Sequence, residues 1–308
     1  MEQQPYTLYQ TILADKSLTP DEIQKEFLKL CSYQATENKR CFAGNPLLYH
    51  FMLDVLCQVQ TKKGMSIKGE AESEERRQYW YAQMLKVKRT GTFAVRFFEV
   101  LRVCQVAINF FKPTIAKFLY RKFKATSVLD PCAGWGGRLL GAMALDGVRY
   151  TGFDTNPLLM KPYRTMMKTL LPHSKHLLTG GEVQEDIWQR RNTAYRMIWG
   201  SSLDYAFETL EEYDFVLTSP PYVNLEVYPG MTPFESEKFF YEQFLIPLID
   251  KCRKHCKSGG RVCFNISPGM YATLTDKFKY KACDEREEML QQIRFGKNKA
   301  DQIYIWRC

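Results

Sequence analysis

The chain has 308 residues, of which 45% are hydrophobic and 25% are charged, an ordinary globular composition that excludes a disordered chain. No apolar run approaches the roughly 20 residues of a membrane helix, and Met1–Pro5 lacks the basic and apolar pattern of a signal peptide. The ten cysteines follow no framework spacing, which is typical of free thiols in a reducing compartment. We therefore expect an intracellular protein, in the cytoplasm or the nucleus, with no membrane partner.

The net charge of +9 is unevenly spread along the chain. The stretch from Gln60 to Lys124 holds 15 Lys or Arg against 5 Glu, which is more than the whole positive excess. Such a basic region suits a polyanion such as nucleic acid, because neutralised phosphates release their counterions. A solvated helical face would have the same composition, so the charge alone leaves both interpretations open.

The first 60 residues predict helices. Thr19-Pro20-Asp21-Glu22 has the pattern of a capping box with proline at the first helical position, and an apolar stripe follows it. A second helix is predicted over Pro46–Val59. The polar stretch Thr61–Glu75, which contains two glycines, predicts an exposed loop.

Basic and aromatic residues are interleaved from Arg76 to Arg89. Positive charge for phosphates and rings for stacking suit a nucleic-acid strand, and burial of the rings against a neighbouring domain is an equal alternative. The candidate phosphate contacts are Arg76, Arg77, Lys86, Lys88 and Arg89. Helices are then predicted over Thr92–Phe111 and Pro113–Phe123.

From Ser127 the pattern changes to alternating strands and helices, which indicates an α/β fold with a parallel sheet. The predicted strand Ser127–Asp130 leads into the glycine-rich turn Pro131–Gly137 and a helix, as in the first unit of a nucleotide-binding sheet. The next strand ends in Asp154, 20 residues after Gly134. An acidic residue at this distance is placed to bind ribose hydroxyls.

Two later strands also end in polar clusters. The strand Arg196–Trp199 precedes Gly200–Asp204, and the strand Tyr213–Thr218 precedes Ser219–Tyr222. Because open α/β sheets bind ligands at the carboxyl ends of their strands, we expect all these clusters to form one site. In the last cluster a hydroxyl, a rigid proline carbonyl and a ring suit a planar ligand that carries an NH2 group.

The remaining predicted elements complete the sheet. We predict helices over Asn156–Leu171 and Phe239–Cys256, a long loop over Val223–Glu237, a fifth strand over Arg261–Ile266, and a closing strand pair at Tyr280–Cys283 and Gln302–Trp306. The loop is long enough to cover a bound substrate.

Asp130–Gly137 and Ser219–Tyr222, at the ends of the first and fourth strands, resemble the cofactor and catalytic motifs of a known family. It is the S-adenosylmethionine-dependent amino-methyltransferases of the DNA N4-cytosine and N6-adenine type, and the resemblance covers Phe110–Cys308. It implies a Rossmann-like α/β sheet of the class I methyltransferases, with seven strands and the last one antiparallel. The methyltransferase domain would span residues 106–308, after a helical, basic region over residues 1–105 that could recognise nucleic acid.

The resemblance also implies roles for individual residues. The cofactor S-adenosyl-L-methionine would contact Lys112, Pro113, Thr114, Asp130, Pro131, Cys132, Ala133, Gly134, Gly136, Asp154, Ser202 and Asp204. The catalytic residues would be Ser219, Pro220, Pro221 and Tyr222. Ser219 and the Pro220 carbonyl would accept hydrogen bonds from an exocyclic amine, and Tyr222 would stack on the base. The methyl group would move in one direct displacement without a cysteine nucleophile.

Serine at the first catalytic position favours N4 of cytosine in DNA. The alternatives are N6 of adenine in DNA, an exocyclic base amine in RNA, and a non-catalytic nucleic-acid-binding subunit with the same fold. A nicotinamide dehydrogenase would leave Ser219–Tyr222 without a role. Cys252, His255 and Cys256 are spaced loosely like metal ligands but lie on one predicted helix without a second pair, so we expect no metal site.

Overall fold

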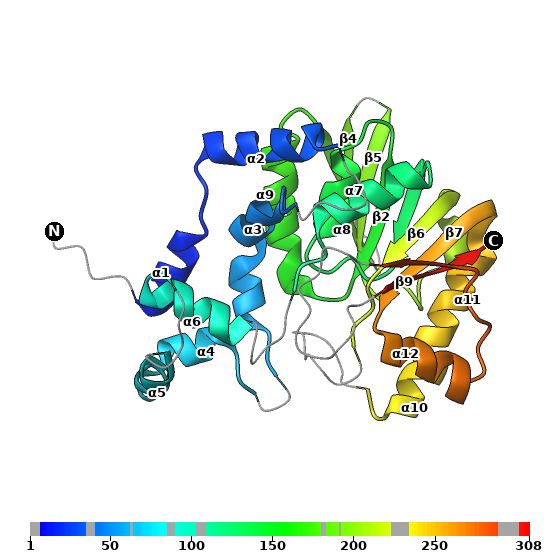
Figure 1. Cartoon of the computed structure of the whole chain (residues 1–308). Coiled ribbons are helices and arrows are strands. Elements are labelled where there is room, and N and C mark those ends of the chain that lie inside the picture. The colour runs from blue at the N-terminus through cyan, green and yellow to red at the C-terminus, as the bar shows by residue number, and fades with distance from the viewer. Residues whose placement is uncertain are drawn as a thin grey trace.

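The computed structural model describes residues 7–34, 41–61, 64–84, 90–102, 109–179, 183–190, 192–222, 234–288 and 302–308 (Figure 1). From Ser127 onward these residues build one mixed sheet with helices on both faces, and the N-terminal helices lie to one side of it. None of the described helices is both long and apolar enough to cross a membrane.

In the described part of the chain nine strands form this sheet, in the order β3-β4-β5-β2-β1-β6-β7-β9-β8. Their bounds are β1 Ser127–Asp130, β2 Arg149–Asp154, β3 Lys175–Thr179, β4 Gln184–Arg190, β5 Thr193–Trp199, β6 Tyr213–Thr218, β7 Cys256–Ile266, β8 Glu285–Glu288 and β9 Gln302–Arg307. The strands β5, β2, β1, β6 and β7 are parallel, and β9 is antiparallel to both of its neighbours. The seven strands from β5 to β8 thus form the expected Rossmann-like sheet of the class I methyltransferases, with its reversed last strand.

The hairpin of β3 and β4 raises the strand number from the predicted seven to nine. Its edge strand β3 is mostly exposed on both faces, so it lacks the alternating apolar pattern from which a strand is predicted. The fully buried Asp186 of β4 attaches the hairpin to the sheet. It accepts hydrogen bonds from Arg164 at 2.9 Å, from His176 at 2.7 Å and from the Trp199 indole at 2.7 Å.

The helices agree in most places with the predicted ones. The α-helices are α1 Leu8–Asp15, α2 Pro20–Ser32, α3 Asn45–Gln58, α4 Ile67–Glu72, α5 Glu74–Met84, α6 Phe93–Leu101, α7 Pro113–Lys122, α8 Gly137–Met143, α9 Met160–Leu170, α10 Glu237–Phe239, α11 Ile246–His255 and α12 Pro268–Ala272. The elements η2 Pro157–Leu159 and η3 Phe207–Thr209 are short 3-10 helices, and η4 Phe240–Leu245 and η5 Thr273–Lys277 are π-helices. The capping box is confirmed, because the Thr19 N–H donates to the Glu22 carboxylate at 2.8 Å and the Glu22 N–H donates to Thr19 Oγ1 at 3.4 Å.

Successive residues of the central strands point to opposite faces of the sheet, and the core divides accordingly. Val128 and Leu217 pack on one face with residues of α7, α8 and α9. Leu129 and Val216 pack on the other face with residues of α11 and α12. Both faces of the parallel strands are therefore buried, as such sheets require.

The N-terminal helices share the first of these cores. Residues of α2, α3 and α6 belong to the same apolar cluster as those of α7, α8 and α9. The buried Lys117 of α7 donates through Nζ to the backbone carbonyls of Leu30, Cys31 and Tyr33 at 2.6–3.0 Å. This lysine satisfies carbonyls at the end of α2 that lack helical partners, and it ties the N-terminal layer to the sheet. The domain boundary at residue 105 stays a prediction.

Four predicted segments differ from the observed ones. The predicted strand Arg261–Ile266 covers only the second part of β7, which begins at Cys256. The predicted loop Thr61–Glu75 contains α4, because the Ser66 hydroxyl caps a helix there by accepting a hydrogen bond from the Gly69 N–H at 3.0 Å. The predicted strand Tyr280–Cys283 lies too early, because β8 takes its register from pairing with β9. The predicted helix Thr92–Phe111 is observed as α6, and residues 103–108 lie outside the described ones.

Candidate active site

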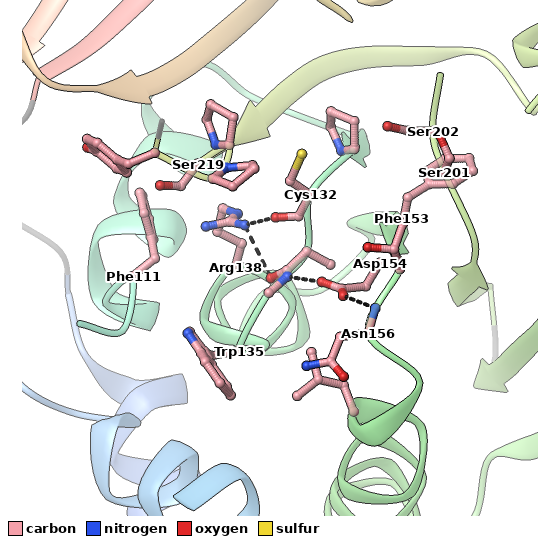
Figure 2. Close-up of a pocket in the computed structure, with 18 of the residues that line it drawn as sticks. Phe111, Cys132, Trp135, Arg138, Phe153, Asp154, Asn156, Ser201, Ser202 and Ser219 are labelled. Atoms are coloured by element: carbon pink, nitrogen blue, oxygen red, sulfur yellow. Dashed lines mark hydrogen bonds between the residues drawn. The ribbon is translucent and has the colours of Figure 1, made fainter. Parts of the chain in front are cut away.

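The carboxyl ends of β1, β2, β5 and β6 surround a pocket of about 240 Å³ (Figure 2). Its lining includes ten of the predicted site residues, namely Pro131, Cys132, Ala133, Gly134, Asp154, Ser202, Ser219, Pro220, Pro221 and Tyr222. Figure 2 shows Ser219 and Phe111 on one side of the pocket and Ser201 and Ser202 on the opposite side. The four polar clusters at the strand ends therefore meet around one cavity.

Gly134 forms the turn after β1 with a φ of 57°, a backbone conformation that favours glycine. A Cβ atom here would have no protein atom nearer than the Cys132 carbonyl oxygen at 3.9 Å, so it would take up pocket space. The Gly134 N–H donates to Asp154 Oδ2 at 2.7 Å, and its carbonyl accepts from the Tyr163 hydroxyl at 2.9 Å. The turn is thus fixed from both sides and presents bare backbone to a ligand.

Asp130 lies beneath this turn and does not line the pocket. It is fully buried and accepts hydrogen bonds from Arg138 Nε at 2.6 Å and from the Tyr150 hydroxyl at 2.7 Å. Arg138 Nη2 also donates to the carbonyls of Cys132 and Ala133 at 2.5 and 3.2 Å. Asp130 therefore holds the turn directly, by accepting the Cys132 N–H at 3.4 Å, and through Arg138, which itself lines the pocket.

Asp154 closes the pocket at the end of β2. Its carboxylate accepts the Gly134 N–H through Oδ2 and the Asn156 N–H through Oδ1 at 2.8 Å. Burial raises the pKa of Asp154 to about 6, although the two N–H groups favour the ionised form. The carboxylate is thus an acceptor whose charge titrates close to neutral pH.

A lysine of α11 holds the loop after β5 in place. Lys251 of α11 donates through Nζ to the carbonyls of Ser202, Leu203 and Tyr205 at 3.0, 2.5 and 2.6 Å. This arrangement holds the buried Ser202 at the pocket, whereas Asp204 points to solvent and lies outside the lining.

Ser219 follows β6 and faces the pocket next to its aromatic residues. Its hydroxyl accepts a hydrogen bond from Asn265 Nδ2 at 3.2 Å. The aromatic residues that line the pocket with it are Phe111, Trp135, Phe153, Tyr222, Phe234 and Phe244. The ring centroids of Phe234 and Phe244 lie 5.2 Å apart. A polar atom surrounded by rings suits a flat, aromatic ligand with a polar edge.

Phe111 reaches the pocket because the chain before α7 packs directly on α8. A Cβ atom at Gly137 would lie 1.9 Å from the Phe111 carbonyl oxygen, so only glycine permits this approach. The Phe111 ring then covers the Arg138 guanidinium, with 5.2 Å between the Arg138 Cζ and the ring centroid.

Four other predicted cofactor residues lie outside the pocket lining. Lys112 and Thr114 are buried, with the Lys112 ammonium 4.4 Å from the Phe42 ring centroid and the Thr114 hydroxyl donating to the Cys41 carbonyl at 3.2 Å. Pro113 is the first residue of α7. Gly136 precedes α8 with a φ of 79°, and a Cβ there would meet Met166 and Tyr163.

The predicted phosphate contacts on α5 take part in contacts within the protein. Arg76 pairs with Glu70 at 2.7 Å, and its Cζ lies 4.7 Å from the Tyr79 ring centroid. Arg77 donates to the carbonyls of Ala71 and Glu72 at the end of α4, at 3.0 and 2.8 Å. Lys86, Lys88 and Arg89 lie outside the described residues.

The cysteine in the pocket is not poised as a nucleophile. Burial raises the pKa of the Cys132 thiol well above its usual range, so the thiol stays protonated and unreactive. Among the described residues no group of three or more His, Cys, Asp or Glu is arranged to hold a metal ion. His255, one of the residues with metal-like spacing, pairs with Glu208 at 3.4 Å.

Sequence reasoning missed several residues at or behind the pocket. Arg138 follows the glycine turn directly, and an arginine next to a buried strand-end carboxylate was a usable signal. Asn156 follows Asp154 by two residues and lines the pocket with a 3% exposed side chain. Lys251 and Asn265 come from later elements, and their neighbours in sequence carry no sign of their place in the site.

No protein-family model matches the chain, and no curated protein matches it. Among solved structures, TrmN from Thermus thermophilus is 14% identical with a TM-score of 0.41, over 71% of this chain and 54% of that one. An rRNA methylase from Streptococcus thermophilus is 11% identical with a TM-score of 0.38, over 65% of this chain and 99% of that one. A methyltransferase from Geobacter sulfurreducens is 9% identical with a TM-score of 0.40, over 77% and 99%. This chain thus spans about half of the length of TrmN, and at these identities the likeness is one of fold.

Proposed function

We propose that this protein is an S-adenosylmethionine-dependent methyltransferase that methylates the exocyclic amine of a base in DNA, with N4 of cytosine as the acceptor. One observation carries the proposal. The glycine turn with Asp154, which suits a nucleoside cofactor, and Ser219–Tyr222, which suits an amine on a flat ring, line the same pocket. A dehydrogenase could use the glycine turn and Asp154, but it would leave Ser219–Tyr222 without a role.

The residues of the β1 and β2 ends fit the cofactor. Gly134 leaves room for a ligand beside its backbone, and Asp154 offers a carboxylate to ribose hydroxyls. Asn156 Nδ2 is buried at the pocket and has no hydrogen-bond partner among the described residues. A buried donor of this kind costs free energy until a ligand supplies an acceptor.

When bound, S-adenosylmethionine supplies an electrophilic methyl group, whose bond to the sulfonium sulfur breaks as its bond to the amine nitrogen forms. Ser219 accepts a hydrogen bond from the amine and keeps the nitrogen lone pair directed at that methyl group. Tyr222 and the phenylalanine rings hold the base and exclude water. The nitrogen, now positively charged, loses one proton, which passes to water when the methylated base leaves the pocket. Positioning and electrostatics supply the catalysis, because no covalent intermediate is needed.

DNA is the proposed polymer because the motif pair resembles the DNA amino-methyltransferases. With Arg76 and Arg77 engaged inside the protein, Lys86, Lys88 and Arg89 remain the proposed phosphate contacts. The charge excess of the region supports binding to nucleic acid without separating DNA from RNA.

The experiment that tests the proposal is mass spectrometry of nucleosides from DNA and RNA after incubation with the enzyme and isotopically labelled S-adenosylmethionine. N4-methyl-2′-deoxycytidine, released from DNA, is the expected product. N6-methyl-2′-deoxyadenosine, or a methylated ribonucleoside released from RNA, would correct the acceptor. No labelled nucleoside from either polymer would favour a non-catalytic nucleic-acid-binding subunit.

Two substitutions test the catalytic assignment. Ser219→Ala and Tyr222→Ala should each lower transfer by at least about 100-fold, while calorimetry still detects cofactor binding. Ser258→Ala is the matched control. Ser258 is exposed near the amino end of β7, whereas the pocket lies at the carboxyl ends of the strands. Undiminished transfer in both test variants would refute the assignment.

A further inference from the structure

Asn265 contacts Ser219 from the neighbouring strand without lining the pocket itself. It lies near the carboxyl end of β7, which pairs in parallel with β6, and its side chain is 4% exposed. Asn265 Nδ2 donates to Ser219 Oγ at 3.2 Å. In return, Ser219 Oγ makes a long hydrogen bond of 3.5 Å to the Asn265 backbone carbonyl.

These two bonds determine how Ser219 can meet a ligand. A serine hydroxyl has one proton to donate and two lone pairs that can accept. The backbone carbonyl of Asn265 accepts the hydrogen bond from the hydroxyl proton. The side-chain amide of Asn265 donates to one of the two lone pairs. One lone pair is left on the pocket side, so Ser219 meets a ligand as a hydrogen-bond acceptor.

The other end of the Asn265 amide reinforces this result. Asn265 Oδ1 is buried and has no hydrogen-bond partner among the described residues. If the amide rotates by half a turn, Oδ1 takes the place of Nδ2 and can accept the serine proton. In both orientations an oxygen of Asn265 accepts the hydrogen bond from the Ser219 hydroxyl. The lone pair of Ser219 on the pocket side therefore remains an acceptor.

A serine without this partner could turn its proton toward the substrate. Cytosine has a ring nitrogen acceptor beside its N4 amine, and adenine has one beside its N6 amine. A free hydroxyl could donate to that acceptor and hold the base in an unproductive position. When Asn265 holds the proton of the Ser219 hydroxyl, the hydroxyl oxygen can only accept from an amine hydrogen and cannot donate to the ring nitrogen.

We propose that Asn265 is a positioning residue that makes Ser219 an obligate acceptor for the substrate amine. The inference rests on the proposed methyl transfer to an exocyclic amine. It also explains why a serine at this position needs a partner, because a hydroxyl carries a proton that must be held away from the base and a carboxylate carries none.

A double-mutant cycle tests the inference, with kcat measured from transfer of labelled methyl to DNA and cofactor affinity measured by calorimetry. Asn265→Ala removes the amide and leaves the serine proton only the long 3.5 Å bond to the backbone carbonyl, which is too weak to hold the hydroxyl in one orientation. The variant should therefore lower kcat about 10- to 100-fold, the effect of losing a buried hydrogen bond at a reacting group. The Kd for S-adenosylmethionine should stay within about twofold of the wild-type value, which also shows that the variant is folded. In the Ser219→Ala background the same substitution should lower kcat no further, because its effect passes through Ser219.

A second variant separates hydrogen bonding from packing. Asn265→Asp has the same shape and keeps an oxygen that can hold the serine proton, so it should retain a larger share of kcat than Asn265→Ala. Equal losses in both variants would assign Asn265 a packing role and overturn the proposal. Losses that multiply in the Ser219→Ala background, a lost cofactor affinity, or an Asn265→Ala kcat above half of the wild-type value would overturn it as well. Wild-type enzyme that methylates neither polymer would instead refute the proposed function itself.

Discussion

Asp154 Oδ2 accepts the Gly134 N–H at 2.7 Å, which joins the tip of β2 to the turn after β1. The two residues are 20 positions apart in sequence, and they become neighbours because β1 and β2 pair in parallel and end at the same level. The bond fixes the ligand-facing backbone of the turn. It also leaves the carboxylate at the pocket.

The affinity for S-adenosylmethionine should fall as the pH drops below 6. In the free protein the pKa of Asp154 is raised from 3.8 to about 6, so the carboxylate takes up a proton in this range. Ribose hydroxyls donate to the ionised form, and protonation therefore competes with binding. Calorimetry between pH 5 and pH 8 should show a Kd that is constant above pH 7 and rises toward tenfold per pH unit well below pH 6.

The matched variant for this prediction is Asp154→Asn, which cannot ionise. It should bind the cofactor more weakly at pH 7 and show a flat Kd between pH 5 and pH 7. The same raised pKa has an opposite effect on the free protein, because a carboxyl group that prefers its proton when folded stabilises the fold at low pH and loses this contribution as the pH rises through 6. A wild-type Kd that does not change from pH 7 to pH 5 would contradict the assignment of Asp154.

The buried pair of Asp130 and Arg138 should be necessary for the fold of the site. Arg138→Leu leaves the fully buried carboxylate of Asp130 without its charged partner, and such a loss costs about 3–5 kcal/mol in unfolding free energy. It also frees the carbonyls of Cys132 and Ala133, so cofactor affinity should fall too. Denaturant unfolding and calorimetry measure the two effects.

The surface pair of Arg149 and Glu211 is the control for the buried one. Their side chains are 39% and 74% exposed, and Arg149→Leu should cost less than about 1 kcal/mol with no change in cofactor affinity. If Arg138→Leu and Arg149→Leu lowered the unfolding free energy equally, the buried pair would stabilise the protein no more than the surface pair does, and the prediction would be wrong.

The parts of the site that could be predicted from sequence are those whose signals are local. The turn at Gly134, the acid at Asp154 and the prolines after β6 stand beside the strands that place them, so strand ends alone bring them together. The seven-stranded sheet with its reversed last strand followed from the resemblance. The hairpin of β3 and β4 could not be predicted, because its edge strand is exposed on both faces.

Residues that support the site from other elements left no local signal. Asn265 lies in the apolar strand β7 and Lys251 in an amphipathic helix, and each meets the site only through long-range packing. The segment from Lys112 to Thr114 shows the opposite case. A proline at the first turn of a helix suggested an anion site, and the residues of that turn lie outside the pocket lining. Their contact with a cofactor stays a prediction.

Lys251 should hold the loop after β5 in a form that binds the cofactor. Lys251→Met removes the donor shared by three carbonyls of residues 202–205, so these acceptors must find water and the loop loosens. We expect the Kd for S-adenosylmethionine to rise about tenfold and the unfolding free energy to fall by about 1–3 kcal/mol. Lys254→Met, an exposed position on the same helix, should leave both quantities unchanged. A Lys251→Met protein with wild-type affinity would show that Ser202 does not depend on this contact.

Asn156 should bind the cofactor through the amide nitrogen that has no partner among the described residues. Its Oδ1 already accepts the Leu158 N–H at 3.1 Å and caps the turn η2. Asn156→Asp and Asn156→Ser keep a capping oxygen, and such residues are nearly equivalent as caps. Both remove the amide donor from the pocket. Both should therefore raise the Kd for S-adenosylmethionine by about tenfold with little change in unfolding free energy.

The comparison of these variants with Asn156→Ala separates capping from ligand binding. Alanine loses the cap as well, so it should lower the unfolding free energy by about 1 kcal/mol in addition to the loss of affinity. The aspartate variant adds a negative charge next to Asp154, whereas the serine variant adds none, so a loss of affinity shared by both cannot come from repulsion. Wild-type affinity in the serine variant would show that the amide nitrogen faces the pocket without contacting the cofactor.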